Sequence, residues 1–180
     1  MDQDNEVVRR VIGGDVESFR FLVKKYERRV LAMVSNVLQD VHSPEDVAQD
    51  VFFTAYRRLG SFDPGRGRFS TWLLTIARHK CLNALKKKAA KAVDSLPETA
   101  SVRTPHDELT RKELFERLDR ELDALPPGQK TAFVLAQLVG LSHEEISQIQ
   151  GVRIGTVRSR ISRARRRLRS SLGQADGGGT

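Results

Sequence analysis

The stretch that most restricts the fold of this chain is "GLSHEEISQIQGV", residues 140–152. Ser142 and Glu145 stand three residues apart, the spacing of a capping box, in which the two side chains accept hydrogen bonds from each other's backbone N–H groups. A capping box marks the start of a helix. Gly151 and Val152 then supply a tight turn after only about two helical turns. The stretch therefore predicts a short helix that ends abruptly.

Beyond this turn, the pattern predicts a second helix that is apolar on one side and strongly basic elsewhere. Its apolar residues recur at spacings of three and four, as on one face of an α-helix: Val157, Ile161, Ala164, Leu168 and Leu172. Residues 151–172 contain eight arginines and no acidic residue, whereas the whole chain has 31 Lys+Arg against 23 Asp+Glu. This stretch thus carries the whole formal net charge of +8.

A short helix, a glycine turn and a basic second helix are typical of a helix-turn-helix. A solvated basic helix that binds RNA or acidic lipid is the alternative, but the capping box and the turn favour the helix-turn-helix. In that motif the second helix enters the DNA major groove, with its N-terminal residues toward base edges. We therefore expect base contacts from Arg158, Ser159, Ser162 and Arg163, and phosphate contacts mostly from residues 165–169. Repressor, activator and initiation factor all remain open.

The remainder of the chain also shows helical periodicity, without convincing strand alternation. Asp15 is expected to cap one long helix, Ser43 with Pro44 to start a second, and Ser70 to cap a third that follows a turn-rich loop at residues 61–69. With 39% hydrophobic residues, the chain has enough apolar side chains for compact but small cores. We expect an all-α fold of two small helical domains joined by a flexible linker.

The domain boundaries follow from a change in composition. The stretch "KAVDSLPETASVRTP", residues 91–105, is small, polar and contains two prolines, which is typical of a linker. We predict a first domain over residues 1–90, a linker over 91–108, a second domain over 109–172, and a disordered tail over 173–180.

Several classes of protein are disfavoured. Cys81 is the only cysteine, so no internal disulfide can form, and the four histidines show no metal-ligand spacing that is more than weak. No apolar run reaches membrane-spanning length, and the N-terminus lacks the apolar core of a signal peptide. We expect a cytoplasmic protein with no cofactor, no metal, no membrane insertion and no enzymatic activity.

The first domain presents two surfaces of opposite character between residues 46 and 88. One helix carries an acidic and amide face with Asp46, Gln49 and Asp50. The following loop and helix carry Trp72 and several cations, and aromatic rings beside cations are typical of single-stranded DNA binding. Taken alone, each aromatic ring is equally typical of a core residue, and the acidic face by itself is more often only a solvated helix face.

Taken together, these motifs resemble the sigma factors of bacterial RNA polymerase. Residues 46–88 resemble their region 2, and the helix-turn-helix resembles their region 4. The compact plan of two modules is similar to the extracytoplasmic-function group, and the resemblance extends from about residue 5 to residue 170. The matching stretches are GDVESFRFLVKKY, DVAQDVF, FSTWLLTIAR, LPPGQKTAFVL and GLSHEEISQIQGVRIGTVRSRISRARRRLR.

The resemblance implies that both domains read promoter DNA. Region 4 would read the −35 element as duplex through Arg153, Thr156, Arg158, Ser159, Arg160, Ser162, Arg163, Arg166 and Arg167. Region 2 would melt the −10 element and hold an extruded base of the non-template strand. The residues that it implies for this task are Arg66, Arg68, Phe69, Trp72, Arg78, His79 and Asn83.

The resemblance also implies partners. Core RNA polymerase would bind Asp46, Gln49, Asp50 and Phe52 through the coiled coil of its largest subunit, and the second domain through the flap of its second-largest subunit. An anti-sigma protein is a further expected partner. The alternative is a free-standing helix-turn-helix regulator, which would bind a palindromic site without polymerase.

Overall fold

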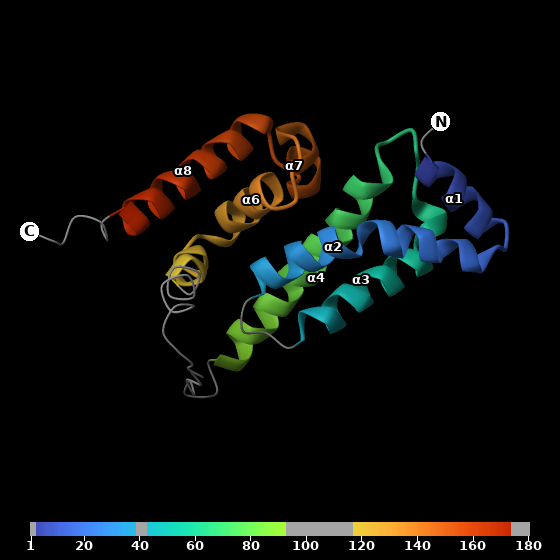
Figure 1. Ribbon diagram of the computed structural model, residues 1–180, viewed down its shortest axis with the longest axis horizontal. Coiled ribbons are helices and arrows are strands. Elements are labelled where there is room, and N and C mark those ends of the chain that lie inside the picture. The colour runs from blue at the N-terminus through green and yellow to red at the C-terminus, as the bar shows by residue number, and fades with distance from the viewer. Residues whose placement is uncertain (1–2, 39–42, 93–116, 174–180) are drawn as a thin grey trace, which may run out of the picture.

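The computed structural model describes residues 3–38, 43–92 and 117–173. These residues form helices, and no β-strand occurs among them, so the predicted all-α fold is confirmed. Nor does any helix in these ranges combine the length and the apolar character needed to cross a membrane. Figure 1 shows the helices in two groups, with α1 to α4 in one and α6 to α8 in the other.

Four helices make up the first group. They are α1 (Gln3–Ile12), α2 (Phe19–Val37), α3 (Pro44–Arg57) and α4 (Phe69–Ala92), with short 3₁₀ helices at Val16–Ser18 and Leu59–Ser61. The central helix is α2, which packs on both α3 and α4. Six residues on one side of α2 are buried: Leu22, Tyr26, Val30, Met33, Val34 and Val37.

All three predicted helix starts differ in detail. Asp15 Oδ1 accepts from Ser18 N–H at 3.2 Å and so caps the 3₁₀ helix Val16–Ser18, which precedes α2. Pro44 is the first residue of α3, as expected, but Ser43 makes no side-chain cap and instead donates its hydroxyl to Glu45 Oε2 at 2.7 Å. The third helix begins before Ser70, because the N–H of Trp72 already donates to the carbonyl of Arg68 at 3.2 Å. Ser70 therefore lies inside the first turn of α4 and is buried there.

The second group contains the helix-turn-helix. Its helices are α6 (Pro127–Gln137), α7 (His143–Gln150) and α8 (Ile154–Gly173). The capping box is confirmed, since Glu145 N–H donates to Ser142 Oγ at 3.2 Å and Ser142 N–H donates to Glu145 Oε2 at 3.0 Å. Gly151 ends α7 with a φ of 64°, a left-handed conformation that favours glycine. Val157, Ile161, Ala164 and Leu168 are buried, as the stripe on α8 predicts.

The connection between the groups lies mostly outside the described residues. Helix α4 continues to Ala92, two residues into the predicted linker, and α8 includes Gly173, the first residue of the tail predicted over 173–180. Residues 93–116 and 174–180 are outside the described ranges. Residues 117–123 are helical and lead into α6.

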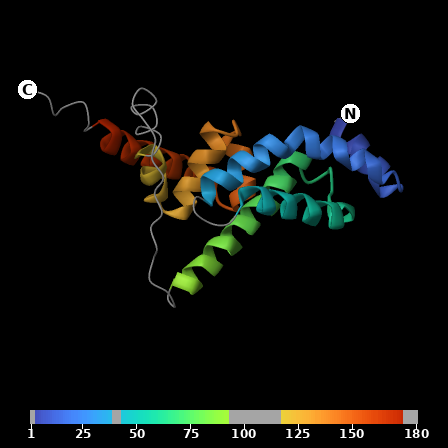
Figure 2. The ribbon, with the colours of Figure 1, turned by 60° about the horizontal axis from the view of Figure 1, so that its bottom comes forward.

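The two groups of helices touch along one seam. Helix α7 packs against α4, and α6 packs against α2, an arrangement that can be followed in Figures 1 and 2. A single buried cluster includes side chains of the first domain together with Leu135, Val139, Ile146 and Ile149 of the second. Arg68, just before α4, also forms an ion pair with Glu145 of α7 at 3.4 Å. Helix α8 packs on α6 and α7.

Candidate DNA and polymerase interfaces

The outer side of α8 forms a basic face. Its buried stripe seats the helix on α6 and α7, which leaves the arginines on the remaining surface exposed. A hollow on this face is lined by four of them and by His143 at the start of α7. The four are Arg158, Arg165, Arg166 and Arg169. So many cations around one hollow favour a polyanionic partner over an apolar one.

Six of the nine residues predicted to contact the −35 element are exposed. These are Arg153, Arg158, Ser162, Arg163, Arg166 and Arg167. The other three are half-buried, and two of them are engaged within the domain. Ser159 donates its hydroxyl to the carbonyl of Thr156 at 2.9 Å. Arg160 donates to Gln150 at the end of α7 at 2.6 Å, so its guanidinium is directed toward the protein and not toward solvent.

The loop before α4 forms a small pocket, here called the loop pocket. Phe62, Arg66, Arg68 and Trp72 are among the residues that line it, and Gln148 of α7 contributes from the other domain. Arg66 lies 3.5 Å from Asp63 on the exposed surface of the loop. Because two aromatic rings and two guanidinium groups border the loop pocket, it has the chemistry to receive a base and its phosphates.

Phe69 does not belong to this surface. Its side chain has 0% exposure and packs on Tyr26, Phe62 and Trp72, with ring centroids 5.5 to 5.7 Å apart. The predicted DNA contact of Phe69 is therefore not available in this arrangement. Phe69 supports the loop pocket from beneath, while Trp72 is half-buried at its border.

The rest of the predicted −10 surface follows α4 along one side. Trp72, His79 and Asn83 are spaced by seven and four residues, which places them in a row on the helix, and the last two are exposed. Arg78 is half-buried beside this row. Desolvation by burial, together with the nearby guanidinium of Arg160, lowers the pKa of Arg78 below its ordinary value.

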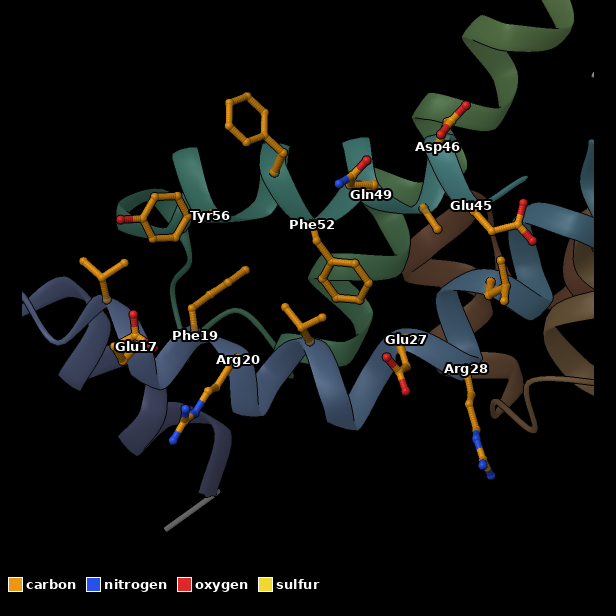
Figure 3. A pocket seen from close by; sticks show the side chains of 15 residues that line it. Glu17, Phe19, Arg20, Glu27, Arg28, Glu45, Asp46, Gln49, Phe52 and Tyr56 are labelled. Atoms are coloured by element: carbon orange, nitrogen blue, oxygen red, sulfur yellow. The ribbon is translucent and has the colours of Figure 1, made fainter. Parts of the chain in front are cut away.

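A groove between α2 and α3 holds most of the residues predicted to dock on polymerase. Asp46, Gln49 and Phe52 line it, and Figure 3 shows Phe52 directed from α3 toward α2, with Gln49 and Asp46 further along the same helix. Asp50 does not line the groove. It forms an ion pair with Lys80 of α4 at 2.7 Å.

Sequence reasoning missed the apolar part of this α2–α3 groove. Val16, Phe53 and Tyr56 line it and are large hydrophobic side chains left exposed, Phe53 to 59%. The opposite wall comes from α2, where Phe19 packs edge-on against Tyr56 with the ring centroids 5.3 Å apart. The spacing of four and three from Gln49 through Phe53 to Tyr56 was a signal that could have indicated this side of α3.

Metal or thiol chemistry finds no support in the described residues. Within residues 3–38, 43–92 and 117–173, no three His, Cys, Asp or Glu side chains gather as metal ligands. Burial raises the pKa of the Cys81 thiol to about 12, which keeps this sulfur protonated near neutral pH.

Two families match this arrangement in the same order along the chain. The Sigma-70 region 2 family matches residues 22–91, and the Sigma-70 region 4 family matches residues 115–168. Among curated relatives, the RNA polymerase sigma-H factor of Pseudomonas aeruginosa is 34% identical over 95% of this chain and 94% of its own length. The ECF RNA polymerase sigma-E factor of Escherichia coli (strain K12) is 35% identical over 90% of each chain.

Two solved structures resemble the whole arrangement. One is CnrH in complex with the cytosolic domain of CnrY, with a TM-score of 0.71 and 28% identity over 98% of this chain and all of that one. The other is the sigma factor RpoE of Bartonella quintana in complex with the anti-sigma factor NepR, with a TM-score of 0.72 and 26% identity over 87% of this chain and 98% of that one.

The chain belongs to the extracytoplasmic-function group of RNA polymerase sigma factors. It is a transcription factor of two helical domains that directs RNA polymerase to specific promoters, and the free-standing regulator is not favoured.

Proposed function

We propose that this sigma factor divides its task among three surfaces. The basic face of α8 reads the −35 element, the loop pocket with α4 reads and melts the −10 element, and the α2–α3 groove docks on core polymerase. The observation that carries the proposal is the separation of these surfaces by chemistry. One is lined by arginines, one by aromatic rings with cations, and one by exposed apolar side chains with an acidic and amide rim.

On the basic face, we assign base contacts to Arg158, Ser162 and Arg163, which are exposed near the start of α8. A guanidinium can bond the O6 and N7 atoms of guanine together, and a good pair of this kind discriminates by about 1–3 kcal/mol. Arg153, Arg166 and Arg167 are assigned to phosphates, which fix the register of the helix in the groove.

On the −10 surface, an unstacked base would enter the loop pocket beside Trp72, while His79 and Asn83 contact the neighbouring nucleotides. Arg66, Arg68 and Arg78 would hold the phosphates. Stacking on a ring contributes about 1–3 kcal/mol per base, which is comparable to the few kcal/mol needed to unstack that base. Phe69 keeps Trp72 in place and makes no DNA contact.

The α2–α3 groove suits a helical partner, because an amphipathic helix lays its apolar face into such a groove and is read at positions three and four apart. We assign the groove to the coiled coil of the largest polymerase subunit, with Phe52 and Phe53 as apolar contacts and with Asp46 and Gln49 at the rim. The flap of the second-largest subunit would contact the second domain.

An anti-sigma protein is proposed as a regulatory partner, since one solved neighbour is bound to an anti-sigma factor and another to a cytosolic partner domain. Because the proposed partners are RNA polymerase and promoter DNA, we place the protein in the cytoplasm and assign it no catalytic step of its own.

The decisive experiment combines the purified protein, bacterial core RNA polymerase and sheared genomic DNA, followed by mapping of transcript 5′ ends. We expect new starts that share two upstream boxes at a fixed spacing. An absence of new starts, together with failure to co-elute with core polymerase, would contradict the proposal.

A further inference from the structure

Arg160 differs from the other arginines of α8. Arg158, Arg163 and Arg167 are exposed, whereas Arg160 is half-buried. It follows the buried Val157 by three residues, which places it at the edge of the buried stripe. Its side chain therefore leaves the helix close to the surface that seats α8 on the rest of the domain.

The guanidinium of Arg160 is held by an amide that is itself fixed. Arg160 Nη1 donates to Gln150 Oε1 at 2.6 Å, and Gln150 Nε2 donates to the carbonyl of Gly128 at 3.2 Å. Gln150 is only 4% exposed. Turning the amide over would place its NH₂ group against a donor and its carbonyl against a carbonyl, so only one orientation satisfies both partners.

Gly128 gives the guanidinium the room that this contact needs. A Cβ atom at residue 128 would lie 3.1 Å from Arg160 Cζ and 3.3 Å from its Nε, which is tighter than ordinary van der Waals contact. Gly128 stands in the first turn of α6, Gln150 is the last residue of α7, and Arg160 is in the second turn of α8. Helices α6, α7 and α8 are thus joined at one point, close to the turn of the helix-turn-helix.

We propose that Arg160 is a positioning residue for −35 recognition. Its guanidinium fixes the rotation and tilt of α8 on α6 and α7, and it makes no phosphate contact, although the resemblance places it among the residues that read the −35 element. This inference rests on the proposed role of α8. It also accounts for the type of residue, because the planar guanidinium can bond the amide while its flat side lies against Gly128, whereas lysine has no planar group to place there.

The test measures the affinity of the full chain for a −35 duplex taken from the mapped promoters and for a scrambled duplex. Each affinity is measured at salt concentrations between about 50 and 200 mM, and its dependence on salt gives the salt slope. For Arg160→Met we expect an unchanged salt slope, because no phosphate contact is lost. The ratio of specific to scrambled affinity should fall roughly fivefold or more, because the base-reading arginines are misaligned.

Arg167→Met is the matched control. Arg167 is exposed and lies seven residues further along α8, on the same side of the helix. Its loss should reduce the magnitude of the salt slope by about 0.9 and weaken binding to both duplexes alike. If Arg160→Met behaved like this control, with the specificity ratio unchanged, the positioning role would be wrong.

Two further variants keep the test independent of folding defects. Arg160→Lys retains the charge, so it should preserve a phosphate contact but lose the specificity ratio if Arg160 acts by positioning. A preserved ratio in Arg160→Lys would overturn the proposal. Gln150→Leu should lower the ratio of specific to scrambled affinity as Arg160→Met does. In the double variant this ratio should fall no further than in the more severely affected single variant, because the two residues act as one unit.

Failure of the proposed function would look different. A wild-type chain without preference for the mapped duplex would remove the −35 role of α8 itself. The free energies of unfolding of Arg160→Met, Gln150→Leu and the double variant would still show whether Arg160 and Gln150 are in contact. Additive losses of stability would show that Arg160 and Gln150 are not coupled, which would overturn the inference, and non-additive losses would uphold their contact.

Discussion

At the scale of single residues, Phe69 and Trp72 show how neighbouring rings in the first turn of α4 take different tasks. The two ring centroids are 5.6 Å apart, yet Phe69 is fully buried and Trp72 borders the loop pocket. We expect Phe69→Ala to cost about 3–5 kcal/mol of unfolding free energy, as large-to-small substitutions of buried rings do. Urea unfolding measures this. A loss below about 1 kcal/mol would mean that the ring is not a core residue.

Trp72→Ala should affect DNA binding more than stability. It removes a half-buried ring, so the loss of stability should be smaller than for Phe69→Ala. Binding of a single-stranded −10 oligonucleotide by the holoenzyme should weaken by about 1–3 kcal/mol, the contribution of one stacked base. Anisotropy of a labelled oligonucleotide measures this loss. Unchanged binding by a folded Trp72→Ala variant would remove the loop pocket from the proposed −10 surface.

At the scale of secondary structure elements, the pair of helices α2 and α3 offers a matched comparison for polymerase docking. Phe53 is 59% exposed and lines the α2–α3 groove, whereas Phe21 on α2 is 52% exposed and lies outside it. Each ring also has an arginine over its face, Arg57 and Arg20 respectively. The two phenylalanines thus differ mainly in the surface to which they belong.

We expect Phe53→Ser to weaken binding of core polymerase and Phe21→Ser to leave it unchanged. Burying a phenylalanine side chain contributes about 1.5–3 kcal/mol, which corresponds to a loss of roughly 10-fold or more in affinity. Competition between each variant and the wild-type chain for limiting core polymerase gives the ratio directly. Equal effects of the two substitutions would mean that polymerase does not use the groove.

The elements also show which features a sequence predicts. The predictions of the capping box of α7 and of the buried stripe of α8 are correct because they depend on spacings of three and four within one helix. The partners of Arg160 and Arg68 lie 10 and 77 residues away, and only packing of separate helices brings them together. For the same reason, the pattern of arginines and rings in residues 61–78 predicted a DNA surface but not that Phe69 turns inward.

At the scale of the whole molecule, contacts between the two domains occupy residues that the proposed −10 surface would use for DNA. Glu145 uses one carboxylate oxygen for the capping box and the other for Arg68 at 3.4 Å. Gln148, one turn further along α7, lines the loop pocket. A nucleotide entering the loop pocket would therefore meet α7 as well as α4, and a phosphate at Arg68 would replace Glu145.

Glu145→Gln tests this competition while leaving the start of α7 intact, since glutamine also serves in a capping box. Because an exposed ion pair contributes about 0.2–1 kcal/mol, the free chain should bind a single-stranded −10 oligonucleotide up to roughly fivefold more tightly after the substitution. Glu144→Gln is the control, because it removes the same charge from the same turn of an exposed surface, and it should have a smaller effect. The gain should disappear in the holoenzyme if polymerase holds the two domains on different subunits. Equal gains from both substitutions would instead indicate general charge repulsion, with no role for the contact between Arg68 and Glu145.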